Sequence, residues 1–215
     1  MFQKIKKLFS KKNSAQHASK EILQISEICN EILSFYIYPK YKEETLVIVL
    51  KKNVNAFDVL QNVKIKNILK KVPFICLEKR EIEESVDVFT LQFFDIKKTS
   101  TLLFGEDIFA NINIENSDLR RKIEFDIRNK NIYLRQEIIR NSATKIIHNI
   151  VPELNPVLHG AKNLNICLDA DELDNLQNYI KHKKFTEKQS LKILKNISIM
   201  LERWADIVDK YEVEK

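Results

Sequence analysis

Hydrophobic and polar positions follow two different periods along this chain, and the change comes near residue 116. Before that point, apolar runs at residues 34–38, 45–50 and 72–77 predict strands, because they are rich in β-branched and aromatic residues. The connection between the first two runs is short enough for a hairpin. Helical spacing at residues 20–33 and 55–70 predicts two helices, the second capped by Asn55.

Two further apolar runs, at residues 87–96 and 101–105, are joined by the polar residues 97–100. Their aromatic and aliphatic content predicts two adjacent strands of a small sheet. Residues 78–86 are expected to form a turn or two of helix. The first part of the chain is therefore expected to be an α/β domain that ends near residue 115.

Only helices are expected after that point. Asn116 or Ser117 caps a long helix whose apolar positions continue to residue 138. Pro152 and Pro156 interrupt the next segment, and Gly160 is expected to end it. Further helices are predicted at residues 171–182 and from Thr186 toward the C-terminus. The predicted organisation is a tail and linker at residues 1–17, an α/β domain at 18–115, and an antiparallel bundle of three to five helices at 116–215.

Composition predicts a globular protein that has a mild preference for anionic partners. Of the 215 residues, 44% are hydrophobic, and the net charge is +6. Cys29, Cys76 and Cys167 lie far apart in apolar surroundings, which predicts buried free thiols in a reducing cytosol. No apolar run approaches the roughly 20 residues of a spanning helix, and the N-terminus lacks the apolar core of a secretory signal. A cytoplasmic location is therefore expected.

The first twelve residues form a basic amphipathic pattern that is typical of a helix lying on an anionic membrane surface. The alternative is a solvated tail, because one short segment of this kind binds weakly on its own. Membrane contact would place the protein at the inner face of the membrane. The residues expected to make this contact are Phe2, Lys4, Ile5, Lys7, Leu8 and Phe9.

The sequence DVFTLQFFDI at residues 87–96, followed by LFGED at residues 103–107, resembles the closing strands of a nucleotidyltransferase-fold domain of the DNA polymerase beta type. Residues 118–136 are similar to the first helix of the bundle found in some bacterial nucleotidyltransferase-like proteins. The resemblance extends from about residue 21 to the C-terminus. It implies a nucleotidyltransferase-like mixed sheet flanked by helices, followed by an all-α bundle.

In active members of this family, a glycine-serine turn holds the nucleotide phosphates, and three carboxylates hold two magnesium ions. The resemblance assigns these carboxylate positions to Glu43, Thr45 and Gln92, and Pro39 stands where the turn should follow Tyr38. A hydroxyl and an amide are poor magnesium ligands beside carboxylates. The resemblance therefore implies no nucleotidyl transfer and no cofactor.

The other candidate groups form no catalytic pattern. Asp87 and Asp95 are retained acids for which structural hydrogen bonding at a strand end is expected. The alternative is a residual enzyme that uses Glu43 and Asp95 in a rearranged site, in which case magnesium would be its cofactor. His148 and His159 are expected to be hydrogen-bonded core or groove residues. With His17 and His182 included, the four histidines show no metal-ligand spacing.

Arginines recur every seventh residue on the predicted long helix, at Arg121, Arg128 and Arg135, with Lys130 nearby. Guanidinium groups on a rigid helix suit phosphate or carboxylate groups. The alternative is a solvated face whose positive charges are balanced by Glu124, Asp126 and Glu137.

Taken together, these patterns predict a catalytically inactive nucleotidyltransferase-fold protein that acts as a binding or regulatory module for a protein partner. A residual nucleotide-binding enzyme and a peripheral membrane scaffold are the alternatives. An anionic ligand or a nucleic acid stays open as a second partner, and the sequence predicts no oligomeric state.

Overall fold

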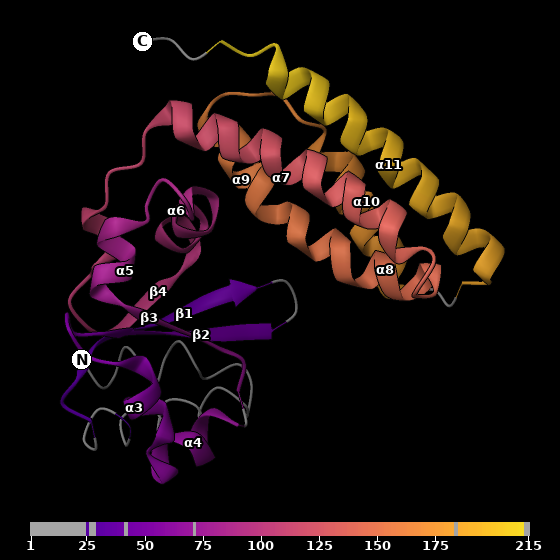
Figure 1. Ribbon diagram of the computed structural model, residues 1–215. Helices are drawn as coiled ribbons and strands as arrows, with labels where there is room; N and C mark the ends of the chain where they lie inside the picture. The colour runs from indigo at the N-terminus through magenta and orange to yellow at the C-terminus, as the bar shows by residue number, and fades with distance from the viewer. Residues whose placement is uncertain (1–24, 26–28, 41–42, 71, 183–184, 213–215) are drawn as a thin grey trace. The chain divides into compact units, whose positions relative to one another are not determined.

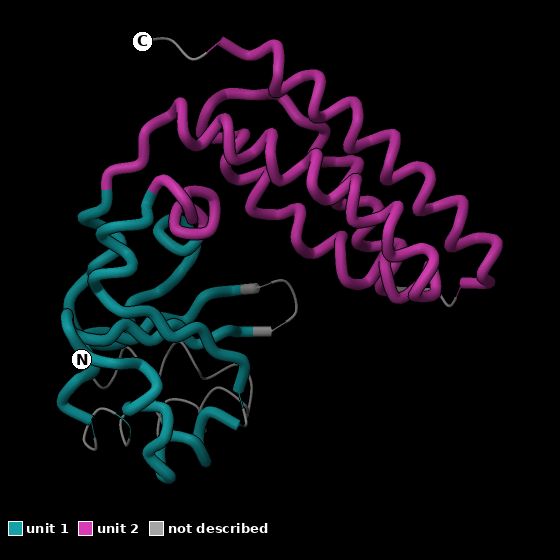
Figure 2. The backbone as a smooth tube through the Cα atoms, in the orientation of Figure 1, with its two compact units in different colours: residues 1–86, 96–112 teal, residues 87–95, 113–215 magenta. Residues whose placement is uncertain are grey.

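A computed structural model describes residues 25, 29–40, 43–70, 72–182 and 185–212. The chain divides into two compact units, which are coloured separately in Figure 2. Unit 1 contains the described residues up to Val86 together with Ile96–Ile112, and unit 2 contains Asp87–Asp95 and the described residues from Asn113 onward. Unit 1 holds a mixed sheet with helices and unit 2 is helical, which confirms the predicted order of a mixed α/β part and a helical part.

The sheet of unit 1 has four strands in the order β3-β2-β1-β4. Strand β1 (Ile32–Lys40) pairs antiparallel with β2 (Glu43–Leu50) and with β4 (Thr101–Gly105), whereas β3 (Phe74–Glu78) runs parallel to β2. The hairpin and the strands predicted at residues 34–38, 45–50, 72–77 and 101–105 are confirmed. Residues 32 and 33, which were expected to end a helix, belong to β1, and most of that predicted helix lies outside the described residues.

Two short helices, α3 (Ala56–Gln61) and α4 (Val63–Leu69), share a hydrophobic core with one face of the sheet. Asn55 caps α3 as predicted, because its side chain accepts a hydrogen bond of 2.9 Å from the backbone N–H of Phe57. The prediction of one helix over residues 55–70 is wrong. Asn62 adopts a non-helical conformation and its side chain caps α4, so the chain restarts as a second helix.

The strand predicted at residues 87–96 is also wrong, because this segment forms helix α6 (Thr90–Thr99) after the short helix α5 (Lys79–Glu84) (Figure 1). Helix α6 buries Leu91 and Phe94 in the core of unit 2. Phe93 and Ile96 are buried as well, so apolar residues extend around much of the helix. A short apolar run of this kind has no visible helical period, and it cannot be told from a buried strand by pattern alone.

Unit 2 contains α7 (Asn116–Glu137), α8 (Ala143–Ile150), α9 (Asn155–Asn163), α10 (Ala170–His182) and α11 (Glu187–Asp209). These α-helices agree with the predicted bundle, and they enclose a core that includes the fully buried Trp204. Pro152 lies in the first turn of a short 3-10 helix, Val151–Leu154, and Pro156 lies in the first turn of α9. Thr186 caps α11 in a capping box with Gln189.

Gly160 does not end a helix, contrary to the prediction, because α9 continues past it to Asn163. A Cβ atom at this position would lie 2.9 Å from Cδ1 of Ile123 and 3.0 Å from Cδ1 of Leu91. Gly160 therefore lets α9 pack closely against these two side chains. Glycine is required at position 105. Its φ is +86°, and a Cβ atom there would lie 1.9 Å from the carbonyl oxygen of Leu33.

Candidate functional site

The three positions that the resemblance assigns to metal-binding carboxylates have different surroundings. Glu43 begins β2, and its side chain lies outside the described part of the chain. Thr45 is buried on β2, where its backbone pairs with that of Tyr38. Gln92 is an exposed residue of helix α6, so its expected place on a strand is wrong. Of the three residues, only Glu43 has a carboxylate side chain.

Of the two retained acids, Asp87 and Asp95, only Asp95 is buried, with 3% of its surface exposed. Its Oδ1 atom lies 2.5 Å from Nδ1 of His159, whose side chain is 45% exposed. Both residues belong to unit 2, and Asp95 lies on a helix rather than at the end of a strand. Asp87 is exposed, and its backbone carbonyl accepts a hydrogen bond of 2.8 Å from the hydroxyl of Thr90. No local sequence pattern indicates the pairing of Asp95 with His159, because the two residues are 64 apart in the chain.

The histidines differ from expectation in their exposure. His148 is exposed on α8 rather than buried in a core, and His159 is hydrogen-bonded but partly exposed. His17 and the side chain of His182 lie outside the described residues. Among the residues that are described, no group of three or more His, Cys, Asp or Glu side chains is placed to hold a metal ion.

The thiols are free, but they are not all buried as predicted. Cys29 is buried, Cys76 is half-buried and Cys167 is exposed. Burial raises the pKa of the Cys76 thiol to about 11, and the nearby carboxylates of Glu81 and Glu78 raise this pKa further. Burial also raises the pKa of Cys29. Because the thiolate is the reactive form, neither residue is suited to act as a nucleophile at neutral pH.

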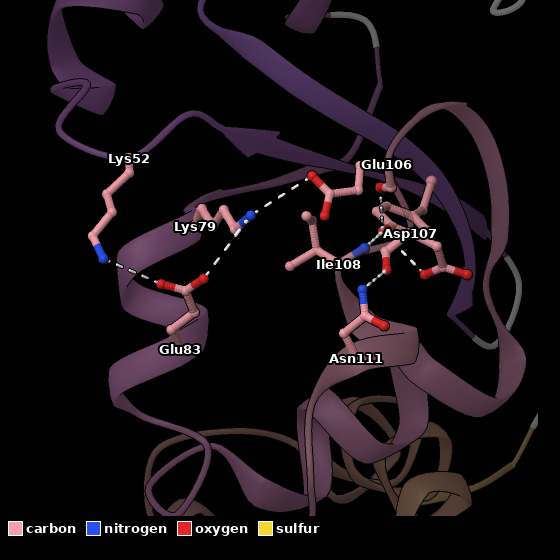
Figure 3. A network of polar contacts seen from close by, with 8 residues as sticks. Lys52, Lys79, Glu83, Glu106, Asp107, Ile108 and Asn111 are labelled. Atoms are coloured by element: carbon pink, nitrogen blue, oxygen red, sulfur yellow. Dashed lines mark hydrogen bonds and ion pairs between the residues drawn. The ribbon is translucent and has the colours of Figure 1, made fainter.

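The turn that follows Gly105 in the family-like sequence uses its two acids for structural contacts (Figure 3). Asp107 accepts a hydrogen bond of 3.1 Å from the backbone N–H of Ala110, and its backbone carbonyl accepts one of 3.3 Å from the Asn111 side chain. Glu106 lies 3.6 Å from Nζ of Lys79. These contacts hold the turn against the start of α5, and they give Glu106 and Asp107 a structural role.

The hydroxyl of Tyr36 anchors the same turn from β1. It accepts a hydrogen bond of 2.7 Å from the backbone N–H of Ile108 and lies 3.2 Å from the carbonyl oxygen of Glu106. Burial raises the pKa of this phenol, so it stays protonated at neutral pH. The sequence offered no signal for this contact, because Tyr36 precedes the turn by 70 residues.

The arginine row of α7, which consists of Arg121, Arg128 and Arg135, lies in solvent along one side of the helix. Each arginine already has an acidic neighbour in unit 2. Arg121 pairs with Asp118, Arg128 pairs with Glu124 at 2.9 Å, and Arg135 pairs with Glu202 at 2.9 Å.

Lys130 is more enclosed than these arginines. It lies between the carboxylates of Asp126, at 3.4 Å, and Glu153, at 3.8 Å. Its charge is therefore balanced within unit 2, and it faces away from the arginine row by its helical position.

Exposed apolar side chains alternate with the arginines, a feature that was not predicted from the sequence. Phe125 is 56% exposed, Ile132 is 51% exposed and Ile139, just beyond the end of α7, is 87% exposed. They follow the same seven-residue spacing, so they extend along the same side of the helix as the arginines. The seven-residue spacing of Phe125, Ile132 and Ile139 is visible in the sequence, and it could have predicted that these apolar residues share a side with the arginines.

A depression of about 270 Å³ lies between α7 and α11. Arg128, Ile132 and Arg135 form its α7 side, and Glu202 and Asp206 belong to its α11 side, with Leu201 and Ala205 between them. The two helices run antiparallel, because Arg120 near the start of α7 bonds to the carbonyl of Val208, whereas Asn131 bonds to Ser198 and Glu202 (Figure 1). We call this depression, together with the exposed apolar residues Phe125, Ile139 and Ile199 that flank it by their helical positions, the α7–α11 face.

The residues predicted to contact a membrane, from Phe2 to Phe9, lie outside the described residues. Among the helices of the described part, none is both long and apolar enough to cross a membrane. Comparison of the chain with protein-family models, with curated proteins and with solved structures found no match.

Proposed function

We propose that this protein is a binding or regulatory module that has a nucleotidyltransferase-like fold and does not transfer nucleotides. The observation that carries the proposal is Thr45. The resemblance to nucleotidyltransferases assigns Thr45 to the position of a metal-binding aspartate, and Thr45 is a buried residue of β2 that carries a neutral hydroxyl. A neutral hydroxyl gives a divalent cation little electrostatic attraction, and Gln92 adds no charge.

The α7–α11 face supports the binding part of the proposal. It combines exposed hydrophobic side chains with charged side chains of both signs, and such a mixture is common where proteins recognise one another. By contrast, the retained acid Asp95 is buried and bonded to His159 within unit 2. That contact gives Asp95 a structural role, which weakens the alternative of a residual enzyme that uses it with Glu43.

Isothermal titration of the full chain with a nucleoside triphosphate tests the proposal, in the presence and in the absence of magnesium. We expect no binding that depends on the metal. The Glu43→Gln variant is the matched control, because it removes the last acid among the three family positions without changing its size. Turnover of nucleotide that requires magnesium and is lost in this variant would refute the proposal.

A further inference from the structure

We infer that the α7–α11 face binds a second copy of this chain. The inference rests on the proposed function, because it names the partner of the same face. The apolar members of the face are exposed. Phe125 and Ile132 lie on one side of α7, Ile139 follows just beyond its end, and Ile199 of α11 is also exposed, with 53% of its surface accessible. An extended row of large apolar side chains in water is characteristic of a protein interface.

The charges of the face identify the occupant. Basic side chains lie on α7, at Arg128 and Arg135, and acidic side chains lie opposite them on α11, at Glu202 and Asp206. The face therefore has a basic row on α7 and an acidic row on α11, and within one copy Arg135 already pairs with Glu202 across it, while Arg128 pairs with Glu124 on α7. An acidic partner would meet the acids of α11, and a basic partner would meet the arginines of α7. Nucleic acid is disfavoured for the same reason, since its phosphates would approach Glu202 and Asp206.

A second copy satisfies both sides at once. A two-fold axis that runs parallel to the helices within the interface places α7 of each copy opposite α11 of the other. The arginines of one copy then face the acids of its partner, and the reverse contact follows by symmetry. The four helices form an antiparallel arrangement in which the exposed isoleucines and Phe125 leave water. The face is thus complementary to itself.

Charge exchange tests this arrangement. One variant carries Arg128→Glu and Arg135→Glu, which makes the face negative, and the other carries Glu202→Lys and Asp206→Lys, which makes it positive. Analytical ultracentrifugation of the full chain over a range of concentrations should show that the unchanged protein dimerises. The dissociation constant of each variant's own dimer should be at least about tenfold higher than that of the unchanged protein, because like charges face each other in these dimers. An equimolar mixture of the two variants should form a heterodimer.

Two controls separate the face from general effects of charge and folding. Lys162→Glu with Lys181→Glu changes the charge by the same amount as the first variant at exposed positions on α9 and α10, and it should dimerise normally. Fluorescence of the single tryptophan, Trp204, checks that each variant keeps the core of unit 2. Ile132→Ser should weaken the dimer without a change of charge.

A protein that stays monomeric at every concentration would overturn the inference, and so would variants that fail to associate when mixed. If the protein stays monomeric and binds an oligonucleotide, and Arg128→Glu with Arg135→Glu abolishes that binding, the face binds a polyanion and the inference of a dimer is wrong. These outcomes leave the titration with nucleotide and magnesium unaffected, so failure of the dimer and failure of the proposed function are distinguishable.

Discussion

Replacement of Gly160 by alanine sets two opposing effects against each other at one position in unit 2. In the interior of a helix, alanine is favoured over glycine by about 1 kcal/mol. The added Cβ atom, however, would lie 2.9 Å from Cδ1 and 3.2 Å from Cγ1 of Ile123, and 3.0 Å from Cδ1 of Leu91. Ile123 and Leu91 are both buried, so neither can move freely into solvent.

The packing term is expected to exceed the helix term. Overpacking of a well-filled core costs about 1–3 kcal/mol, and the gain of about 1 kcal/mol in helix propensity offsets part of this cost. We therefore expect Gly160→Ala to lower the free energy of unfolding of unit 2 by about 1 kcal/mol, within a range of about 0–2 kcal/mol. Ile123→Val removes the Cδ1 atom that lies closest to the new Cβ atom.

A double-mutant cycle in chemical denaturation measures this conflict, with the fluorescence of Trp204 reporting on unit 2. Ile123→Val alone should cost about 0.5–1.5 kcal/mol, as is usual for the loss of a buried methyl group. In the presence of alanine at position 160 it should cost at least about 0.5 kcal/mol less, because it relieves the close contact. A Gly160→Ala protein that is more stable by the full helix-propensity gain, with no coupling to position 123, would refute the close packing of α9.

Three further predictions concern other residues of the described chain. At pH 8, a thiol reagent should modify Cys167 rapidly and Cys76 slowly, because burial raises the pKa of Cys76 to about 11, and equal rates for the two thiols would contradict this. His159→Ala should destabilise unit 2 by about 1–3 kcal/mol in the same denaturation assay, because the buried Asp95 loses a hydrogen bond, and unchanged stability would argue against a structural role for the pair. Thr186→Ala should cost about 1 kcal/mol through loss of the α11 cap, whereas Thr186→Ser, which retains the hydroxyl, should cost much less.

The elements that could be predicted from sequence are those with an unambiguous period or a local capping signal. Residues 45–50 of strand β2 are all buried and mostly β-branched, and Thr186 starts α11 with a local capping box. Helix α6 could not be predicted in this way. Its apolar residues are buried on more than one side, so a period of 3.6 residues disappears from the sequence, and packing rather than pattern decides its conformation.

Residues of the candidate site were predictable only when they were close in sequence. The row of Arg121, Arg128 and Arg135 was visible because one helix carries all three. The contact of Asp95 with His159, and that of Arg135 with Glu202, joins residues that are 64 and 67 apart in the chain. No local period encodes such a contact, since it depends on how separate elements pack.

The opposite charges on the two sides of the α7–α11 face illustrate why chemistry read from one helix can mislead. Considered alone, the arginines of α7 predict an anion-binding surface. The antiparallel packing of α11 brings Glu202 and Asp206 to the same depression, so the net charge that a ligand would meet is no longer positive. A polyanion gains little from such a surface, whereas a partner with the same two rows in the opposite order places opposite charges against both rows and adds contacts to the ion pairs already present within each chain. The packing of the bundle therefore favours the protein partner that the sequence predicts over the anionic ligand that the arginine row alone suggests.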